Sequence, residues 1–231
     1  MHDQLPLSGL TIAFDLDGTL VDTAPDLIGS LNTVLAEEGL SPLPYDEVRL
    51  MVGRGAKALL EMGFAAAGAP LDADRAPRLV ERFIAVYLDR IALESTPFPG
   101  TVAALEKLRA DGAKLCVCTN KLTGLSEALL DALDLTRLFD AVVGQDQAPA
   151  PKPDARHLLT TIEAVGGRPD RAILVGDSIT DVGAGKNAKV PVVVVSFGYT
   201  EAPARELGGD IVIDHFDELD GVVRAWMAGA A

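Results

Sequence analysis

Two aspartates that follow an apolar run have the clearest chemical potential in this sequence. The run Leu10–Phe14 leads into the hexapeptide DLDGTL at positions 15–20, in which Gly18 opens a turn. Side chains two positions apart on a strand point to the same face, so we expect the carboxylates of Asp15 and Asp17 to lie close together. Two such anions repel each other unless a cation joins them. The pair therefore predicts an oxygen-ligand metal site for Mg²⁺, with one carboxylate free to attack an electrophile.

Aspartates at a strand end also cap turns and helices, which is the simpler explanation of this pair. Other expected strands, however, end in polar groups as well: Thr119-Asn120, Lys152-Pro153 after a proline-rich loop, and Gly176-Asp177-Ser178 with Asp181 one turn beyond. In open α/β sheets, ligands bind beyond the carboxyl ends of the strands. Carboxylates, a hydroxyl and a cation gathered there are the parts needed to hold and attack a phosphoryl group.

Short apolar runs separated by amphipathic helices are expected to position these groups. The expected strands are Leu10–Phe14, Lys114–Cys118, Ala141–Val143, Ala172–Val175, Val190–Val195 and Ile211–Ile213. The segments Thr101–Ala110 and Pro153–Val165 are typical of the helices between them. Strands that are continuously apolar indicate a parallel sheet covered on both faces. We therefore predict a Rossmann-like α/β core.

The connection between the first two expected strands is far longer than a crossover requires. Its pattern is helical: Thr23 reads as an N-cap before an early Pro25, and this helix is expected to end near Gly39. Further helices are expected over Tyr45–Met51, Gly55–Ala67 and Pro77–Ile91. We predict an inserted all-helical cap at 20–95, with residues 1–19 and 96–231 forming the core.

Composition and charge narrow the class of partner. The chain has 231 residues, 48% of them hydrophobic, and a formal net charge of −14. An acidic surface disfavours nucleic acid and anionic membrane, so we expect neither as a partner. A small phosphorylated metabolite fits if the site carries local positive charge. The sequence leaves open whether the protein is a monomer or a homodimer.

The two cysteines and the N-terminal residues indicate the cellular compartment in which the protein is expected. Cys116 and Cys118 lie on one expected buried strand, where neighbours on one face are poorly placed for a disulfide. Residues 1–4 lack the basic region and apolar core of a signal peptide. We therefore expect a reducing, cytoplasmic environment.

The polar motifs, in this order, resemble those of the haloacid dehalogenase superfamily of aspartate-nucleophile phosphatases. The resemblance rests on Asp15-Leu16-Asp17-Gly18-Thr19, Thr119-Asn120, Lys152-Pro153 and Gly176-Asp177-Ser178-Ile179-Thr180-Asp181. It implies that Asp15 attacks phosphorus and that Asp17 acts as general acid and then as general base. It also implies Mg²⁺ at Asp15, Asp177 and the backbone carbonyl of Asp17, and Thr119 and Lys152 on the transferring oxygens.

Four further residues in these motifs are expected to contact the substrate or to support the site. Asn120 and Gly18 are expected to contact substrate. Asp181 either binds a metal-bound water, orients Lys152 or stabilises a helix N-terminus, and Ser178 is similarly ambiguous.

Local sequences outside the four motifs indicate which group of enzymes within the superfamily the chain resembles. Residues 14–27 and 52–56, with FGYT at 197–200 and IDHFDEL at 213–219, resemble phosphoglycolate phosphatases, which implies 2-phosphoglycolate as substrate. Arg54 is then a candidate for binding the substrate carboxylate or a solvated cation, and Lys57 a surface or rim residue. The alternatives are a sugar phosphatase or a phosphomutase like β-phosphoglucomutase. Outside enzymes, the alternative is a receiver-type phospho-accepting domain.

Overall fold

The computed structural model describes residues 5–200 and 202–229. Residues 1–4, on which the argument against a signal peptide rests, lie outside the described residues. Within the described part of the chain, every helix is too short or too polar to cross a lipid bilayer.

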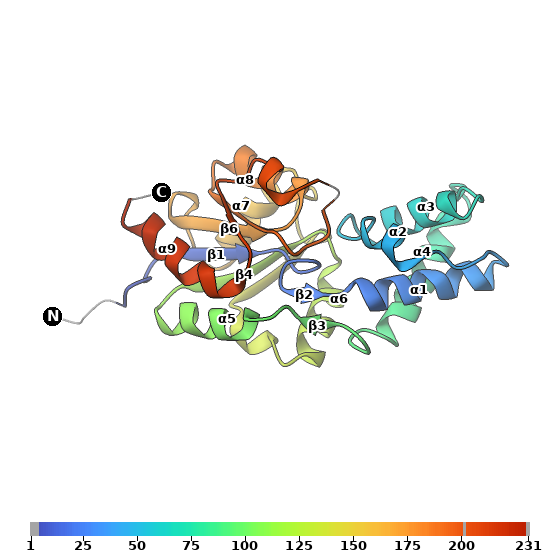
Figure 1. Cartoon of the computed structure of the whole chain (residues 1–231), viewed down its shortest axis with the longest axis horizontal. Coiled ribbons are helices and arrows are strands. Elements are labelled where there is room, and N and C mark those ends of the chain that lie inside the picture. The colour runs from blue at the N-terminus through green and yellow to red at the C-terminus, as the bar shows by residue number, and fades with distance from the viewer. Residues whose placement is uncertain (1–4, 201, 230–231) are drawn as a thin grey trace.

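A six-stranded parallel sheet, in the order β5-β4-β1-β6-β7-β8, forms the core (Figure 1). Its strands are β1 (Thr11–Phe14), β4 (Lys114–Thr119), β5 (Ala141–Gly144), β6 (Ala172–Gly176), β7 (Val192–Val195) and β8 (Ile211–Ile213). β1 lies at the centre, with Thr11 opposite both Lys114 of β4 and Ala172 of β6. This confirms the predicted α/β class, and every expected apolar run contains or overlaps a strand.

Helices cover both faces of this sheet. α5 (Thr101–Ala110), α6 (Thr123–Ala132) and α9 (Leu219–Met227) pack on the face that presents Phe14 and Val117. α7 (Ala155–Ala164) and α8 (Ile179–Ala188) pack on the opposite face, which carries Ala13, Cys116 and Cys118. Both cysteines are buried and free, as expected. Short 3₁₀ turns lie at Thr136–Leu138, Pro169–Arg171, Ala204–Glu206 and Phe216–Glu218.

The long connection folds as a cluster of helices beyond one end of the sheet (Figure 1). It contains α1 (Ala24–Glu37), α2 (Tyr45–Arg49), α3 (Ala56–Ala66) and α4 (Ala76–Leu88). Their apolar faces share a hydrophobic core that includes the buried side chains Leu31, Leu60, Phe64 and Phe83. We call these four helices the cap.

A two-stranded antiparallel ribbon connects the cap to the core. β2 (Val21–Asp22) leaves the core and pairs with β3 (Thr96–Pro97), which brings the chain back. Next to it, the fully buried Asp26 accepts hydrogen bonds from the backbone nitrogens of Glu94 and Ser95 and from the Ser95 hydroxyl, at 2.7–2.9 Å. The outgoing and returning segments are thus held together at the base of the cap.

The start of α1 differs from the expectation in one respect. Thr23 is the N-cap residue of α1 and Pro25 lies in its first turn, as predicted, but the Thr23 side chain makes no capping hydrogen bond. Its hydroxyl instead donates to Asp17 Oδ1 at 2.7 Å. The backbone nitrogen of Ala24 donates to the Tyr199 hydroxyl, which supplies the acceptor that a cap would otherwise provide.

Candidate active site

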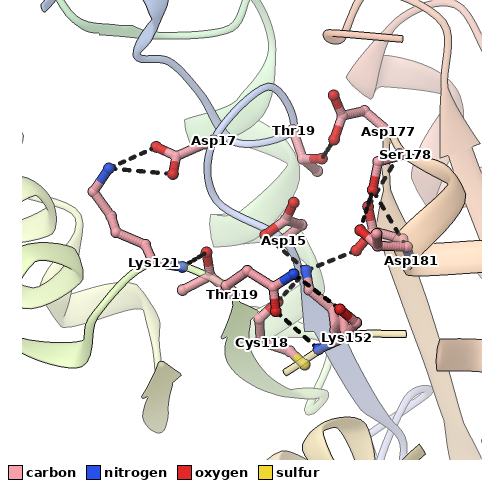
Figure 2. A network of polar contacts seen from close by, with 12 residues as sticks. Asp15, Asp17, Thr19, Cys118, Thr119, Lys121, Lys152, Asp177, Ser178 and Asp181 are labelled. Carbon is pink, nitrogen blue, oxygen red and sulfur yellow. Dashed lines mark hydrogen bonds and ion pairs between the residues drawn. The ribbon is translucent and has the colours of Figure 1, made fainter. Parts of the chain in front are cut away.

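The carboxyl ends of β1, β4 and β6 bring the expected polar groups together (Figure 2). Asp15, Asp17, Thr119, Lys152 and Asp177 are all at least 93% buried. Thr119 is the last residue of β4, and the others lie in loops that follow β1, β5 and β6, which is why residues distant in sequence meet at one edge of the sheet.

The first aspartate lies beside a buried lysine. Lys152 Nζ is 2.8 Å from Asp15 Oδ1, 2.7 Å from Asp181 Oδ1 and 2.7 Å from the carbonyl oxygen of Cys118. Burial raises the pKa of Asp15 to about 7, although Lys152 opposes this shift and the charges of Asp181 and Asp17 add to it. The neighbouring carboxylates keep the pKa of Lys152 above its usual range despite burial. Lys152 therefore remains a cation that holds Asp15 in place.

Asp15, Asp177 and Asp181 form a cluster whose oxygens lie within 4.8 Å of one another. Burial raises the pKa of Asp177 to about 8, and the negative charges of Asp15 and Asp181 add to that shift. The charges present do not balance this cluster fully, and hard oxygen ligands suit a divalent cation such as Mg²⁺. The residues therefore fit a metal site at this edge.

The loop after β1 needs a glycine to reach this cluster. Gly18 has φ of +83°, and a Cβ there would lie 2.4 Å from Asp177 Oδ2. The same carboxylate accepts a hydrogen bond from the Tyr199 backbone nitrogen at 2.6 Å and one from the Thr19 hydroxyl at 3.2 Å. Gly18 thus allows the loop to pack directly against Asp177.

The second aspartate has different neighbours. Asp17 points to Lys121, whose Nζ lies 2.9 Å from Oδ1 and 3.2 Å from Oδ2, whereas Asp177 lies on the other side of Asp15 (Figure 2). The Thr23 hydroxyl also donates to Asp17 Oδ1. Asp17 is thus held apart from the carboxylate cluster, with a cation of its own.

Lys121 is a residue of the candidate site that sequence reasoning missed. It is 6% exposed, and Asp17 raises its pKa although burial alone would lower it. Its Nζ lies 4.4 Å from the ring centroid of Tyr87 on α4, so it also connects the core to the cap. Its position directly after Thr119-Asn120, at the end of β4, was the signal that could have identified it.

Asn120, Ser178 and Asp181 have positioning roles in this structure. The Asn120 side chain, expected on substrate, accepts from the Lys152 backbone nitrogen at 2.8 Å and donates to the Lys152 carbonyl at 3.1 Å. Ser178 and Asp181 form a reciprocal capping box at the start of α8. Because Asp181 also contacts Lys152, it orients that lysine and stabilises the helix at once.

The two cap cations considered from sequence lie in different surroundings. Arg54 lines a cavity with Ser178, Thr180 and Tyr199, which adjoins the cavity beside Asp17 because Val52 and Gly53 line both. Lys57 is largely exposed and lies 3.7 Å from Glu61. The role of Arg54 in binding a carboxylate therefore stays a prediction.

The fold, the cap and the carboxylate-lysine site define a hydrolase of the haloacid dehalogenase-like family. Residues 12–195 match that family, described as haloacid dehalogenase-like hydrolase, and the chain belongs to it. Among its relatives, a phosphoglycolate phosphatase from Caulobacter vibrioides is 64% identical, over 94% of this chain and 90% of that protein. One of the same name from Agrobacterium fabrum is 49% identical, over 93% and 91%.

Solved structures show the same architecture. A crystal structure of a predicted phosphoglycolate phosphatase from Haemophilus somnus 129PT superposes with a TM-score of 0.86 at 29% sequence identity. The match covers 94% of this chain and 98% of that one.

Proposed function

We propose that this chain is a Mg²⁺-dependent phosphatase that hydrolyses 2-phosphoglycolate to glycolate and phosphate. The observation that carries the chemistry is the different environment of the two aspartates. Asp15 lies beside Lys152 and the carboxylate cluster, and Asp17 lies beside Lys121 at a cavity under the cap. The printed names of the relatives support the choice of substrate.

The mechanism divides two half-reactions between these aspartates. An Asp15 oxygen attacks phosphorus, the bond from phosphorus to the ester oxygen breaks, and Asp17 delivers a proton to the departing alkoxide. Asp17 then takes a proton from the water that attacks the aspartyl-phosphate, which releases phosphate and regenerates Asp15. The carboxylates of Asp15 and Asp177 and the carbonyl of Asp17 would hold Mg²⁺, which would supply positive charge against the repulsion between nucleophile and phosphoryl group.

The remaining residues hold the groups that react. Lys152 holds Asp15, Asp181 keeps Lys152 in position, and the Thr119 hydroxyl would donate to a transferring oxygen. The two buried free thiols support the expected cytoplasmic location, which stays a prediction.

A screen of phosphate release over small phosphomonoesters, with Mg²⁺ or with excess chelator, tests the proposal. We expect 2-phosphoglycolate to have the highest kcat/KM, chelator to abolish turnover, and Ca²⁺ to substitute poorly because its coordination is larger and looser.

Asp15→Asn should abolish turnover, and Asp17→Asn should slow both half-reactions. Near-normal activity of Asp15→Asn, or turnover in chelator, would contradict the mechanism. A hexose phosphate that is hydrolysed far better, or is isomerised, would replace the assignment with a sugar phosphatase or a mutase.

A further inference from the structure

A narrow cavity lies between the end of β4 and the cap, next to Asp17. Asp17, Lys121 and Tyr87 supply the polar side chains among its lining residues, and the others are glycines or apolar residues, including Leu59 and Phe83. An ester oxygen that takes its proton from Asp17 must lie at this cavity. The leaving group of the substrate therefore extends into it, and its few polar side chains are the ones able to distinguish one ester from another.

Lys121 provides this cavity with one buried positive charge. In this structure Asp17 is its counter-ion, at 2.9 Å. The Lys121 side chain is buried, and the cavity that it lines is otherwise mostly apolar. Lys121 is the one cation among the described residues that line it. An anionic group on a molecule in this cavity would therefore pair with the Lys121 ammonium, because a charge removed from water needs an opposite charge beside it.

Tyr87 provides a second sign of a missing ligand. Its side chain is fully buried, and although the Lys121 ammonium lies close to it, its hydroxyl makes no hydrogen bond of good geometry within the part of the chain that the structure describes. Burial raises the pKa of Tyr87 to about 12, so the hydroxyl keeps its proton and can donate. A buried donor without an acceptor destabilises a protein, and such groups are uncommon unless a ligand or water satisfies them.

We propose that the Lys121 ammonium and the Tyr87 hydroxyl together bind the carboxylate of the substrate's leaving group. The inference rests on the proposed function, because it assigns the second anionic group of 2-phosphoglycolate. In that molecule one methylene separates the carboxylate from the ester oxygen, so both groups fit a cavity where Lys121 directly contacts Asp17. Arg54, the cation expected from sequence, lines the neighbouring cavity instead.

Tyr87→Phe is the sharper test, because it removes one oxygen and keeps the ring under Lys121. The matched substrates are 2-phosphoglycolate and 2-hydroxyethyl phosphate, in which an alcohol replaces the carboxylate. We expect kcat/KM for phosphoglycolate to fall about tenfold or more and that for hydroxyethyl phosphate to fall much less, because an alcohol accepts a weaker hydrogen bond than a carboxylate. The melting temperature should change little, since the lost hydroxyl makes no hydrogen bond of good geometry with the described residues. Equal kcat/KM ratios in wild type and variant would overturn the role of Tyr87.

Lys121→Met tests the charge, with Lys57→Met on the exposed face of the cap as the matched control. Lys121→Met slows both substrates because Asp17 loses its partner, so the readout is the ratio of the two kcat/KM values. We expect that ratio to shift against phosphoglycolate by about 10- to 150-fold, and to stay unchanged in Lys57→Met. Equal losses on both substrates, or a selective loss in Arg54→Met alone, would refute the inference. If wild type itself shows no preference for phosphoglycolate, the proposed function fails instead.

Discussion

Asp15 and Asp17 are two positions apart, yet a different lysine holds each of them. Lys152 contacts Asp15 and Lys121 contacts Asp17, at 2.8 and 2.9 Å. One carboxylate is thereby placed beside the metal cluster and the other beside the cavity under the cap. Two residues of the same type can therefore take different chemical roles, because their surroundings differ.

A buried histidine makes a residue-level prediction that does not involve the metal site. His157 is fully buried, its Nε2 bonds the Val143 carbonyl at 3.2 Å, and its Nδ1 has no hydrogen-bond partner among the described residues. Burial, assisted by the charge of Lys152, lowers its pKa to about 4. In the unfolded chain this imidazole binds a proton near pH 6.5, whereas in the folded protein it stays neutral until the pH approaches 4. Stability should therefore be lost as pH falls between these values, by roughly 1.4 kcal/mol per pH unit from this group.

Urea unfolding of wild type and His157→Gln from pH 7 to pH 4 measures that contribution. We expect the wild-type free energy of unfolding to fall more steeply than that of the variant. His215→Gln, at a side chain that is 44% exposed, is the control and should follow wild type. Parallel curves for wild type and His157→Gln would show that His157 contributes nothing to the acid sensitivity.

At the scale of elements, the apolar pattern predicted the strands of the core because the sheet is covered on both faces, most completely at its inner strands. α5 matches its expected bounds, Thr101–Ala110, and the cap helices fall within three residues of theirs at each end. The ribbon of β2 and β3 was not expected, since two-residue strands carry no periodic signal. Lys121 was missed because its partners Asp17 and Tyr87 are distant in sequence and meet it only in the folded chain. The hydrogen bond from Thr23 to Asp17 was missed because it depends on the path of the loop after β1, which carries no periodic signal.

The base of the cap should depend on Asp26, the acceptor of the hydrogen bonds from Glu94 and Ser95. Asp26→Asn removes the charge and places an amide where donors converge. We expect the free energy of unfolding to fall by about 1.5–3 kcal/mol, the cost of losing hydrogen bonds to a buried charged group. Asp74→Asn, at an exposed cap position, is the control and should change stability little. A loss of equal size in both variants would point to net charge rather than to the hydrogen bonds at Asp26.

At the scale of the whole molecule, a strongly acidic protein is proposed to bind a dianionic substrate. The chain carries a net charge of −14, so its surface as a whole repels phosphate esters. Attraction must come from local charges at the edge of the sheet, namely Lys152, Lys121 and the metal. Substrate binding should therefore be coupled to metal binding.

Thermal unfolding measures that coupling without turnover. A fluoride complex that mimics phosphate should raise the melting temperature of wild type strongly when Mg²⁺ is present and little in chelator, because a ligand stabilises only the state that binds it. Asp177→Asn should lose most of this shift, since it removes a carboxylate from the metal cluster. A full shift in chelator would show that the anion binds without the cation.

The ribbon at the base of the cap has a consequence for how the chain folds. β1 is the central strand, yet its partner Lys114 on β4 is separated from Thr11 by the whole cap. Closing so long a loop costs conformational entropy and slows folding, as in proteins of high contact order. When the cap helices form from local contacts and β2 pairs with β3, the loop that remains between β1 and β4 becomes short. Early assembly of the cap thus speeds the pairing of strands on which the nucleophile depends.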